Sequence, residues 1–185
     1  MDTTGGGLYD VAVVGLGPAG RALASRCAAS GLTVLAIDPR PDAPWRQTLT
    51  LWADQLPPWL ARDACGVDVL AHTVRGPVHY SPGRTVLDRV YGIVDNSALR
   101  EALPLGAGVT VETAAVDDSR LPDLLHRAHR VVDCRGAGGP GHRGPLQTAY
   151  GIVLSAADAA PAEILADRDL LLSVNLILQI VALKM

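Results

Sequence analysis

The sequence of 185 residues contains three cysteines, no phenylalanine and a single lysine. The cysteines, Cys27, Cys65 and Cys134, are far apart and odd in number, which excludes a disulfide framework and a Cys-x-x-Cys metal site. We therefore expect a cytoplasmic protein without a metal site. Excess positive charge is also missing, since the net charge is −3. This excludes nucleic-acid binding, which needs a basic patch.

The chain also lacks a run of apolar residues long enough for a membrane span. Residues 170–183 are uncharged, but a spanning helix needs about 20 residues. Residues 1–7 show neither the basic nor the apolar region of a signal peptide. Hydrophobic residues nevertheless make up 49% of the chain, and the mean hydropathy is +0.23. This composition predicts a folded core rather than disorder.

A strand, a glycine-rich turn and a helix are predicted near the N-terminus. Residues 10–14 form a short apolar run typical of a buried parallel strand. Residues 15–20 read Gly-Leu-Gly-Pro-Ala-Gly and match the Gly-x-Gly-x-x-Gly pattern. Residues 21–30 are predicted to be helical, and residues 32–37 form a second apolar strand. This order of elements is the context in which the glycine pattern predicts a dinucleotide site.

Each residue of the turn has a physical role in such a site. Gly15 permits the tight turn, Gly17 lets the backbone approach the pyrophosphate, and Gly20 lets the helix pack on the strand. Pro18 and Ala19 complete the turn at the helix N-terminus, where free N–H groups and the positive end of the helix dipole attract phosphate. The alternative is a glycine-rich turn that binds nothing.

Asp38 ends the second predicted strand, 18 residues after Gly20. A carboxylate at about this spacing accepts hydrogen bonds from ribose hydroxyls and repels a 2′-phosphate. NADP is therefore disfavoured, although Arg40 offsets part of the repulsion. The alternative is that Asp38 is a surface acid.

The remaining predicted elements complete an α/β pattern with an antiparallel excursion, which is typical of a doubly wound sheet. Asn96 is predicted to cap a helix over residues 97–103. The other predicted elements are strands over residues 74–80, 84–88, 108–116, 131–134 and 148–154, a strand or helical turn over 49–56, and a helix over 121–130.

Several pieces of sequence, in a fixed order, resemble one known family. They are Ala36-Ile-Asp-Pro39, Leu51-Trp-Ala-Asp-Gln-Leu-Pro57, Arg89-Val-Tyr-Gly-Ile-Val-Asp-Asn96, Val131-Val-Asp-Cys-Arg-Gly136 and Gln147-Thr-Ala-Tyr-Gly-Ile-Val153. The glycine turn resembles that of aromatic-hydroxylase-type flavoproteins. The ordered set, over residues 10–172, resembles the bacterial FAD-dependent lycopene β-cyclases.

This resemblance implies a Rossmann-like FAD-binding domain. It also implies a carotenoid substrate, lycopene, whose end groups are closed into rings through a carbocation, with NAD(P)H reducing the flavin. Gly136 belongs to an element that lies close to the cofactor in that family, and Arg100 falls on a helix whose arginine approaches it. A surface arginine is the alternative for Arg100. Because carotenoids reside in membranes, a peripheral membrane contact is a further expectation.

The family pattern is broken in two regions. Where its tryptophan motif continues as Asp-Glu, this chain has Asp54-Gln55, and glutamine cannot protonate an alkene. Asp54 remains a candidate for stabilising the cation, with a loop acid on the surface as the alternative. Residues 173–185 do not resemble the family and contain the one lysine, Lys184. We therefore expect an FAD/NAD(P)-binding domain over residues 8–172, an atypical tail over 173–185, and a truncated or frameshifted gene with reduced or no activity.

Two other functions share the predicted fold. A flavin monooxygenase or prenyl reductase would carry the same glycine turn, although the tryptophan motif and residues 147–153 disfavour both. A dinucleotide-binding module without catalysis is the third possibility. The tail itself is expected to be either a strand of the core or a segment that rests on a membrane.

Overall fold

The computed structural model describes residues 8–80, 83–136, 150–154, 170–175 and 178–184. Contacts divide the chain into two compact units. The first unit contains the glycine turn and comprises Met1–Arg46 and Leu99–Pro145. The second comprises Gln47–Ala98 and Leu146–Met185.

A four-stranded parallel sheet forms the centre of the first unit. Its order is β8-β2-β1-β9, with β1 at Tyr9–Val14, β2 at Val34–Asp38, β8 at Val109–Thr113 and β9 at Ala128–Asp133. Each neighbouring pair is parallel. The inner strands β1 and β2 are buried on both faces, which explains why their sequences are continuous apolar runs rather than alternating ones. The predicted Rossmann-like α/β architecture is confirmed.

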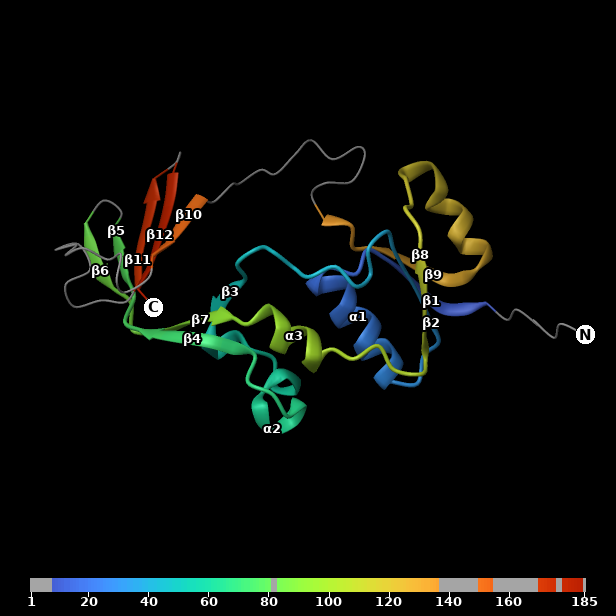
Figure 1. Cartoon of the computed structure of the whole chain (residues 1–185), viewed down its shortest axis with the longest axis horizontal. Coiled ribbons are helices and arrows are strands. Elements are labelled where there is room, and N and C mark those ends of the chain that lie inside the picture. Colours follow the sequence, from blue (N-terminus) through green and yellow to red (C-terminus); the bar gives the residue numbers. More distant parts are fainter. Residues whose placement is uncertain (1–7, 81–82, 137–149, 155–169, 176–177, 185) are drawn as a thin grey trace, which may run out of the picture. The chain divides into compact units, whose positions relative to one another are not determined.

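Different elements cover the two faces of this sheet (Figure 1). Helix α1, Pro18–Ala29, lies on one face, and the short 3-10 helices η3, Asp118–Arg120, and η4, Pro122–His126, lie on the other. Alternate residues of the strands therefore enter two separate clusters. The α1 side contains Val11, Val13, Val34, Ala36 and Ala24. The η4 side contains Ala12, Val14, Leu35, Ile37, Leu124 and Ala128.

The predicted helix over residues 121–130 is wrong. The helical spacing of its leucines is realised only in η4, which starts with Pro122 and ends at His126. The chain then becomes strand β9 at Ala128, which pairs with Tyr9 of β1 and is fully buried. Pairing with the central strand therefore overrides the local helical pattern.

Two helix starts also differ from the sequence prediction. Helix α1 begins at Pro18, because the glycine turn itself supplies its first turn and proline suits the first helical position. Helix α3 spans Asn96–Ala102, and Asp95, not Asn96, caps it. The Oδ1 atom of Asp95 accepts hydrogen bonds from the backbone N–H groups of Ser97 and Ala98.

The second unit contains the predicted antiparallel excursion. Strands β3, Thr50–Trp52, and β4, Leu70–Arg75, flank β7, Val90–Val94, in antiparallel pairing. Strand β7 was not predicted. The predicted strand over residues 74–80 is broken at Gly76-Pro77, so that β5, Val78–Tyr80, joins a different sheet. Three short helices lie between β3 and β4: η1 at Ala53–Gln55, η2 at Pro58–Leu60 and α2 at Arg62–Cys65.

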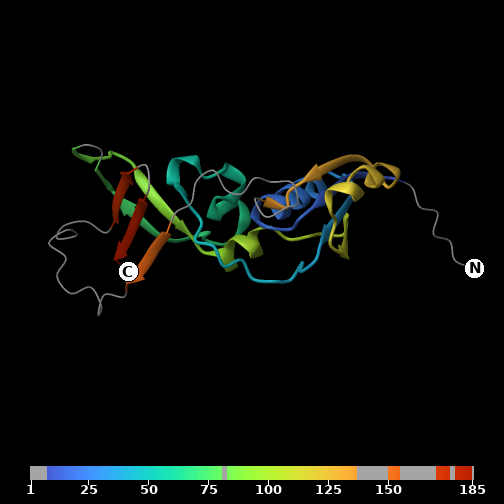
Figure 2. The same cartoon turned by 90° about the horizontal axis from the view of Figure 1, so that it is seen from above.

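A five-stranded sheet of order β10-β12-β11-β5-β6 completes the second unit. The red strand β11, Leu170–Asn175, pairs with the green strand β5 (Figures 1 and 2). On the outer sides of this pair, β12, Leu178–Lys184, pairs with β11, and β6, Arg84–Val86, pairs with β5. Strand β10 is Tyr150–Leu154, and residues 148–149 of its predicted span lie outside the described residues. Of the predicted tail, residues 173–175 belong to β11 and residues 178–184 form β12. Within the described residues, no helix is long and apolar enough to cross a membrane.

Candidate functional site: the glycine turn

Two of the three turn glycines are required by close backbone packing. Gly15 has φ +96°, and a Cβ atom there would lie 2.7 Å from the backbone C and O atoms of Cys134. A Cβ atom on Gly20 would lie 1.8 Å from the Gly15 carbonyl oxygen and 3.0 Å from the Cys134 Cβ. These contacts bring the end of β9 against the turn and the start of α1 against β1.

Gly17 differs from the other two, because a Cβ atom there would meet no described residue within 4 Å. It is the N-cap of α1, its φ is −61°, and no side chain from the described part of the chain caps the helix. Pro18 follows at the first helical position, and Ala19 comes next. The first backbone N–H groups of α1 are therefore not occupied by a capping side chain of the described residues, and they are available to an anion.

Asp38 lies beside this turn, at the end of β2. Its Oδ2 atom accepts a hydrogen bond from the Leu16 N–H at 2.7 Å, and its Oδ1 atom accepts one from the Arg40 N–H at 2.7 Å. A carboxylate has about four acceptor positions, so two bonds leave capacity for ribose hydroxyls. The sequence therefore predicted the position of Asp38, but not that it also holds the turn.

Arg100, on α3, is engaged with the loop that follows Asp38. Its guanidinium donates to the carbonyl oxygens of Ala43 and Pro41, each at 2.8 Å, and its Cζ atom lies 5.9 Å from the Trp45 ring centroid. The Trp45 indole N–H in turn donates to the Leu16 carbonyl at 3.3 Å. Arg100 thus secures the loop of residues 40–45 beside the glycine turn, and Trp45 rests on that turn.

Gly136 ends the described segment that follows β9, with φ +77°. Arg135, the residue before it, binds Asp133 and Asp118 and donates to the Val116 carbonyl at 2.8 Å. These carboxylates raise the pKa of Arg135 above its usual range. Within the Val131–Gly136 motif, Arg135 therefore has a structural role, because it links the end of β9 to the segment before η3.

Asp54 lies in the second unit, on η1, and is paired with Arg89. The guanidinium of Arg89 binds the two carboxylate oxygens of Asp54 at 2.5 and 3.2 Å, while its Cζ atom lies 4.4 Å from the Trp52 ring centroid. Trp52 packs edge-on against Tyr91, with ring centroids 5.0 Å apart. Asp54 is 63% exposed, but it is held in one orientation.

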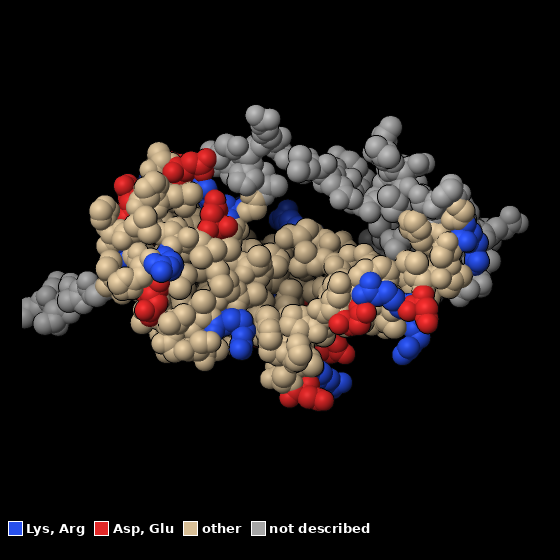
Figure 3. Space-filling view, turned by 180° about the vertical axis from the view of Figure 1, so that it is seen from behind, with Lys and Arg blue, Asp and Glu red and all other residues tan. Residues whose placement is uncertain are grey.

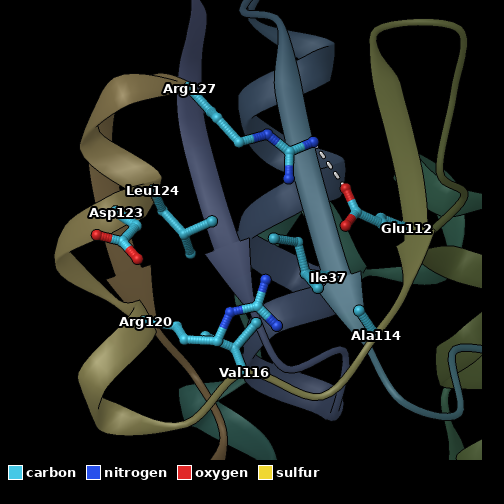
Figure 4. Close-up of a pocket in the computed structure, with 8 residues that line it drawn as sticks. All are labelled: Ile37, Glu112, Ala114, Val116, Arg120, Asp123, Leu124 and Arg127. Carbon is cyan, nitrogen blue, oxygen red and sulfur yellow. Dashed lines mark hydrogen bonds and ion pairs between the residues drawn. The ribbon is translucent and has the colours of Figure 1, made fainter.

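A separate small pocket lies on the face of the parallel sheet away from α1 (Figure 4). Its cavity volume is about 80 Å³, and Arg127 donates to Glu112 beside it at 2.7 Å. Acidic and basic side chains are interspersed over the described residues visible in Figure 3. The glycine turn lies outside this pocket, whose lining residues are Ile37, Glu112, Ala114, Val116, Arg120, Asp123, Leu124 and Arg127.

Comparison with known families identifies the chain. A family model described as lycopene cyclase protein matches residues 10–162. The chain belongs to the lycopene cyclase family. A protein of Deinococcus radiodurans named uncharacterized carotenoid cyclase is 34% identical over 163 residues, which are 78% of this chain and 38% of that protein.

Plant members of the lycopene cyclase family match shorter segments. The chloroplastic lycopene beta cyclases of Nicotiana tabacum and Arabidopsis thaliana are 38% and 35% identical, over 55% and 72% of this chain and 20% and 26% of their own lengths. The chain thus matches well under half the length of these relatives. Among solved structures, a peptidyl tryptophan dihydroxylase essential for tryptophylquinone cofactor biogenesis has a TM-score of 0.47 and 22% identity, over 78% of this chain and 35% of that chain.

The sequence analysis gave no individual role to two arginines, Arg89 and Arg21. Arg89 is 35 residues from Asp54, and no local spacing pattern joins them. Arg21 follows Gly20 in the first turn of α1, where acidic residues are favoured over basic ones. This unfavourable position of a cation, which the sequence alone contains, was a signal that Arg21 would be stabilised by a partner of negative charge.

Proposed function

We propose that this chain binds FAD at the glycine turn and belongs to a machinery that cyclises the end groups of lycopene. The observation that carries the proposal is the combination of an uncapped α1 N-terminus, open space at Gly17 and the adjacent Asp38 carboxylate, in a chain of the lycopene cyclase family. Open space at Gly17 allows a pyrophosphate to approach the backbone as closely as in other dinucleotide sites.

The chemistry of the donors and acceptors fits a dinucleotide. The N–H groups at the start of α1 would hold the pyrophosphate, and Asp38 would accept the ribose hydroxyls with its remaining lone pairs. A ribose 2′-phosphate would meet a carboxylate that already lies within 2.7 Å of two backbone nitrogen atoms. FAD, which has no 2′-phosphate, is therefore favoured at this turn over NADP.

The proposed substrate is a carotenoid, on the strength of the family and of the relatives' names. Ring closure proceeds through a carbocation after a terminal double bond is protonated. When bound and reduced by NAD(P)H, the flavin would stabilise that cation or assist proton movement. Because lycopene is a membrane-borne hydrocarbon, we also propose that the protein contacts a membrane surface.

Asp54 is the proposed fixed negative charge of this chemistry. Its pairing with Arg89 keeps the carboxylate in one orientation, but also neutralises part of its charge. A carboxylate held by a guanidinium suits positioning or cation stabilisation better than proton donation. Gln55, the next residue, has no acidic proton to supply. The proton would therefore come from a group other than these two.

Flavin binding is tested on the purified full chain. We expect flavin absorbance in the protein as isolated, or saturable quenching of tryptophan emission on titration with FAD. NAD titrated in parallel should bind more weakly. Tighter binding of NAD would overturn the assignment of FAD.

Cyclase activity is tested by expressing the chain in a lycopene-accumulating host. Ring-bearing carotenoids in the extract would support cyclisation, and their loss with Asp54→Asn would support the role of Asp54. Lycopene alone, in a host that produces the folded flavin-bound protein, would contradict cyclase activity of this chain. It would leave a dinucleotide-binding module as the function.

A further inference from the structure

Two arginines lie near the glycine turn, and their environments differ sharply. Arg100 has its acceptors already: the Ala43 and Pro41 carbonyl oxygens at 2.8 Å and the Asp42 carboxylate at 3.4 Å. In Arg21, by contrast, Nε is shielded from solvent and finds no acceptor among the described residues of the chain. Of these two arginines, Arg21 is therefore the one whose donor has no acceptor in the described part of the chain.

The position of Arg21 is unfavourable for a cation in the ligand-free protein. It lies in the first turn of α1, at the positive end of the helix dipole, where a cation is disfavoured. Burial and the nearby charge of Arg100 both lower its pKa, and Asp42 only partly opposes them. A buried, unpaired donor costs free energy unless a ligand supplies an acceptor. An anion beside the α1 N-terminus would accept a hydrogen bond from Arg21 and would also offset its unfavourable positive charge.

We propose that the two arginines divide the work of the nucleotide site: Arg21 contacts a phosphate of the bound dinucleotide, and Arg100 is a positioning residue that acts through the loop of residues 40–45. This inference rests on the proposed nucleotide site, and it assigns to Arg21 the contact with the cofactor that the family resemblance suggested for Arg100. The chain of contacts from Arg100 to Pro41 and Ala43, and from Trp45 to the Leu16 carbonyl, is the path by which Arg100 affects the turn.

The test compares Arg21→Met with Arg26→Met, which removes the same charge from an exposed position in the last turn of the same helix. We expect Arg21→Met to weaken binding of FAD and of ADP about ten- to hundredfold, the loss typical of a hydrogen bond to a charged group. Arg21→Met should also flatten the decrease of affinity with rising salt. Arg26→Met should leave both properties close to those of the wild-type protein.

The second part of the test uses Arg100→Met. It is made in a protein in which Trp52 and Trp59 are replaced by Phe, so that the tryptophan emission comes from Trp45 alone. We expect Arg100→Met to shift Trp45 emission before any ligand is added, and to weaken FAD and ADP while keeping the wild-type salt dependence. Arg21→Met should leave Trp45 emission unchanged. Arg21→Met should not lower the melting temperature of the ligand-free protein, since its Nε donor has no acceptor among the described residues there.

Each outcome separates this inference from the proposed function. If ADP binds and Arg21→Met weakens it but FAD does not bind, the role of Arg21 stands and the assignment of FAD fails. If FAD binds equally well to wild type and Arg21→Met, the inference is wrong and the flavin site stands. Binding of neither FAD nor ADP to the folded wild-type chain would overturn both.

Discussion

Glycines in the same hexapeptide have different physical duties, and the structure separates them. Gly20 is needed for packing, because a Cβ atom there would collide with the Gly15 carbonyl oxygen at 1.8 Å. Gly17 has open space around its Cβ position and an ordinary φ of −61°. Gly20 is therefore required for packing, whereas Gly17 affects how closely a ligand can approach the turn.

We predict that Gly20→Ala lowers the free energy of unfolding by about 3 kcal/mol or more, since backbone atoms of two elements must separate. Gly17→Ala is its matched control. It should change the free energy of unfolding by no more than about 1 kcal/mol, because the restricted unfolded chain of alanine opposes its poorer ability to cap α1. Urea unfolding followed by circular dichroism measures both variants. Equal destabilisation of the two would contradict the assignment of Gly20 to packing.

The same pair of variants separates binding from folding. Gly17→Ala should remain folded but bind FAD at least about tenfold more weakly, because a methyl group would stand where the pyrophosphate approaches. Unchanged FAD affinity in the folded Gly17→Ala protein would show that the ligand does not approach this turn closely.

At the scale of elements, the ends of the helices and strands and their pairing partners were harder to predict than the presence of each element. The run of leucines before β9 has helical spacing, but Ala128 is needed as the first buried residue of a strand that pairs with β1. Likewise, Asp95 caps α3 although Asn96 has equal intrinsic capping ability. A one-residue difference of this kind depends on how the preceding strand β7 ends, which local sequence does not specify.

Asp95→Ala should lower the free energy of unfolding by about 1 kcal/mol, because two N–H groups at the start of α3 lose their acceptor. Asp95→Asn should cost much less, since its side-chain oxygen can accept the same bonds. Chemical unfolding of both variants tests this. If Asn96→Ala instead of Asp95→Ala removed the helix start, the structural assignment of the cap would be wrong.

The ion pair between Glu112 of β8 and Arg127, just before β9, predicts a pH effect. The hydrogen bond from Arg127 lowers the pKa of Glu112 below its usual value in the folded protein. Its contribution is therefore fully present above the ordinary glutamate pKa and is lost as the pH falls through the lowered one. Both side chains are partly exposed, so the contribution should be under about 1 kcal/mol.

The measurement compares unfolding of the wild type and Glu112→Gln at about pH 6 and about pH 3, above and below the ordinary glutamate pKa. The stability difference between the two proteins should shrink at the lower pH. Arg127→Gln should reduce the pH dependence in the same way. A difference that grows on acidification would mean that the pair does not favour the ionised carboxylate.

At the scale of the whole molecule, the chain consists of two units with separate candidate chemistry. The glycine turn, Asp38 and both Arg21 and Arg100 belong to the first unit, and the pair of Asp54 and Arg89 belongs to the second. The chain also matches only 38% of the length of its Deinococcus relative. Nucleotide binding can therefore be measured in this chain apart from the activity proposed for the family.

Bound FAD should stabilise the first unit. At a free concentration one hundred times the dissociation constant, a ligand that binds only the folded state adds about 2.7 kcal/mol to the free energy of unfolding. Trp45 is the tryptophan of the first unit, so its emission in a Trp52→Phe, Trp59→Phe background follows that unit. We expect FAD to raise the temperature of the transition that Trp45 reports. No change at saturating FAD would place its binding elsewhere.

The sequence by itself determined the strand, turn and helix of residues 9–29, the place of Asp38 and the family, because these depend on contiguous residues whose spacing dictates the backbone conformation. Only the tertiary structure decided which side chains meet. Arg100 reaches Ala43 across 57 positions and Arg89 reaches Asp54 across 35, and β9 is a strand because β1 is beside it. Contacts of this kind follow from the path of the whole chain, and no local pattern encodes that path.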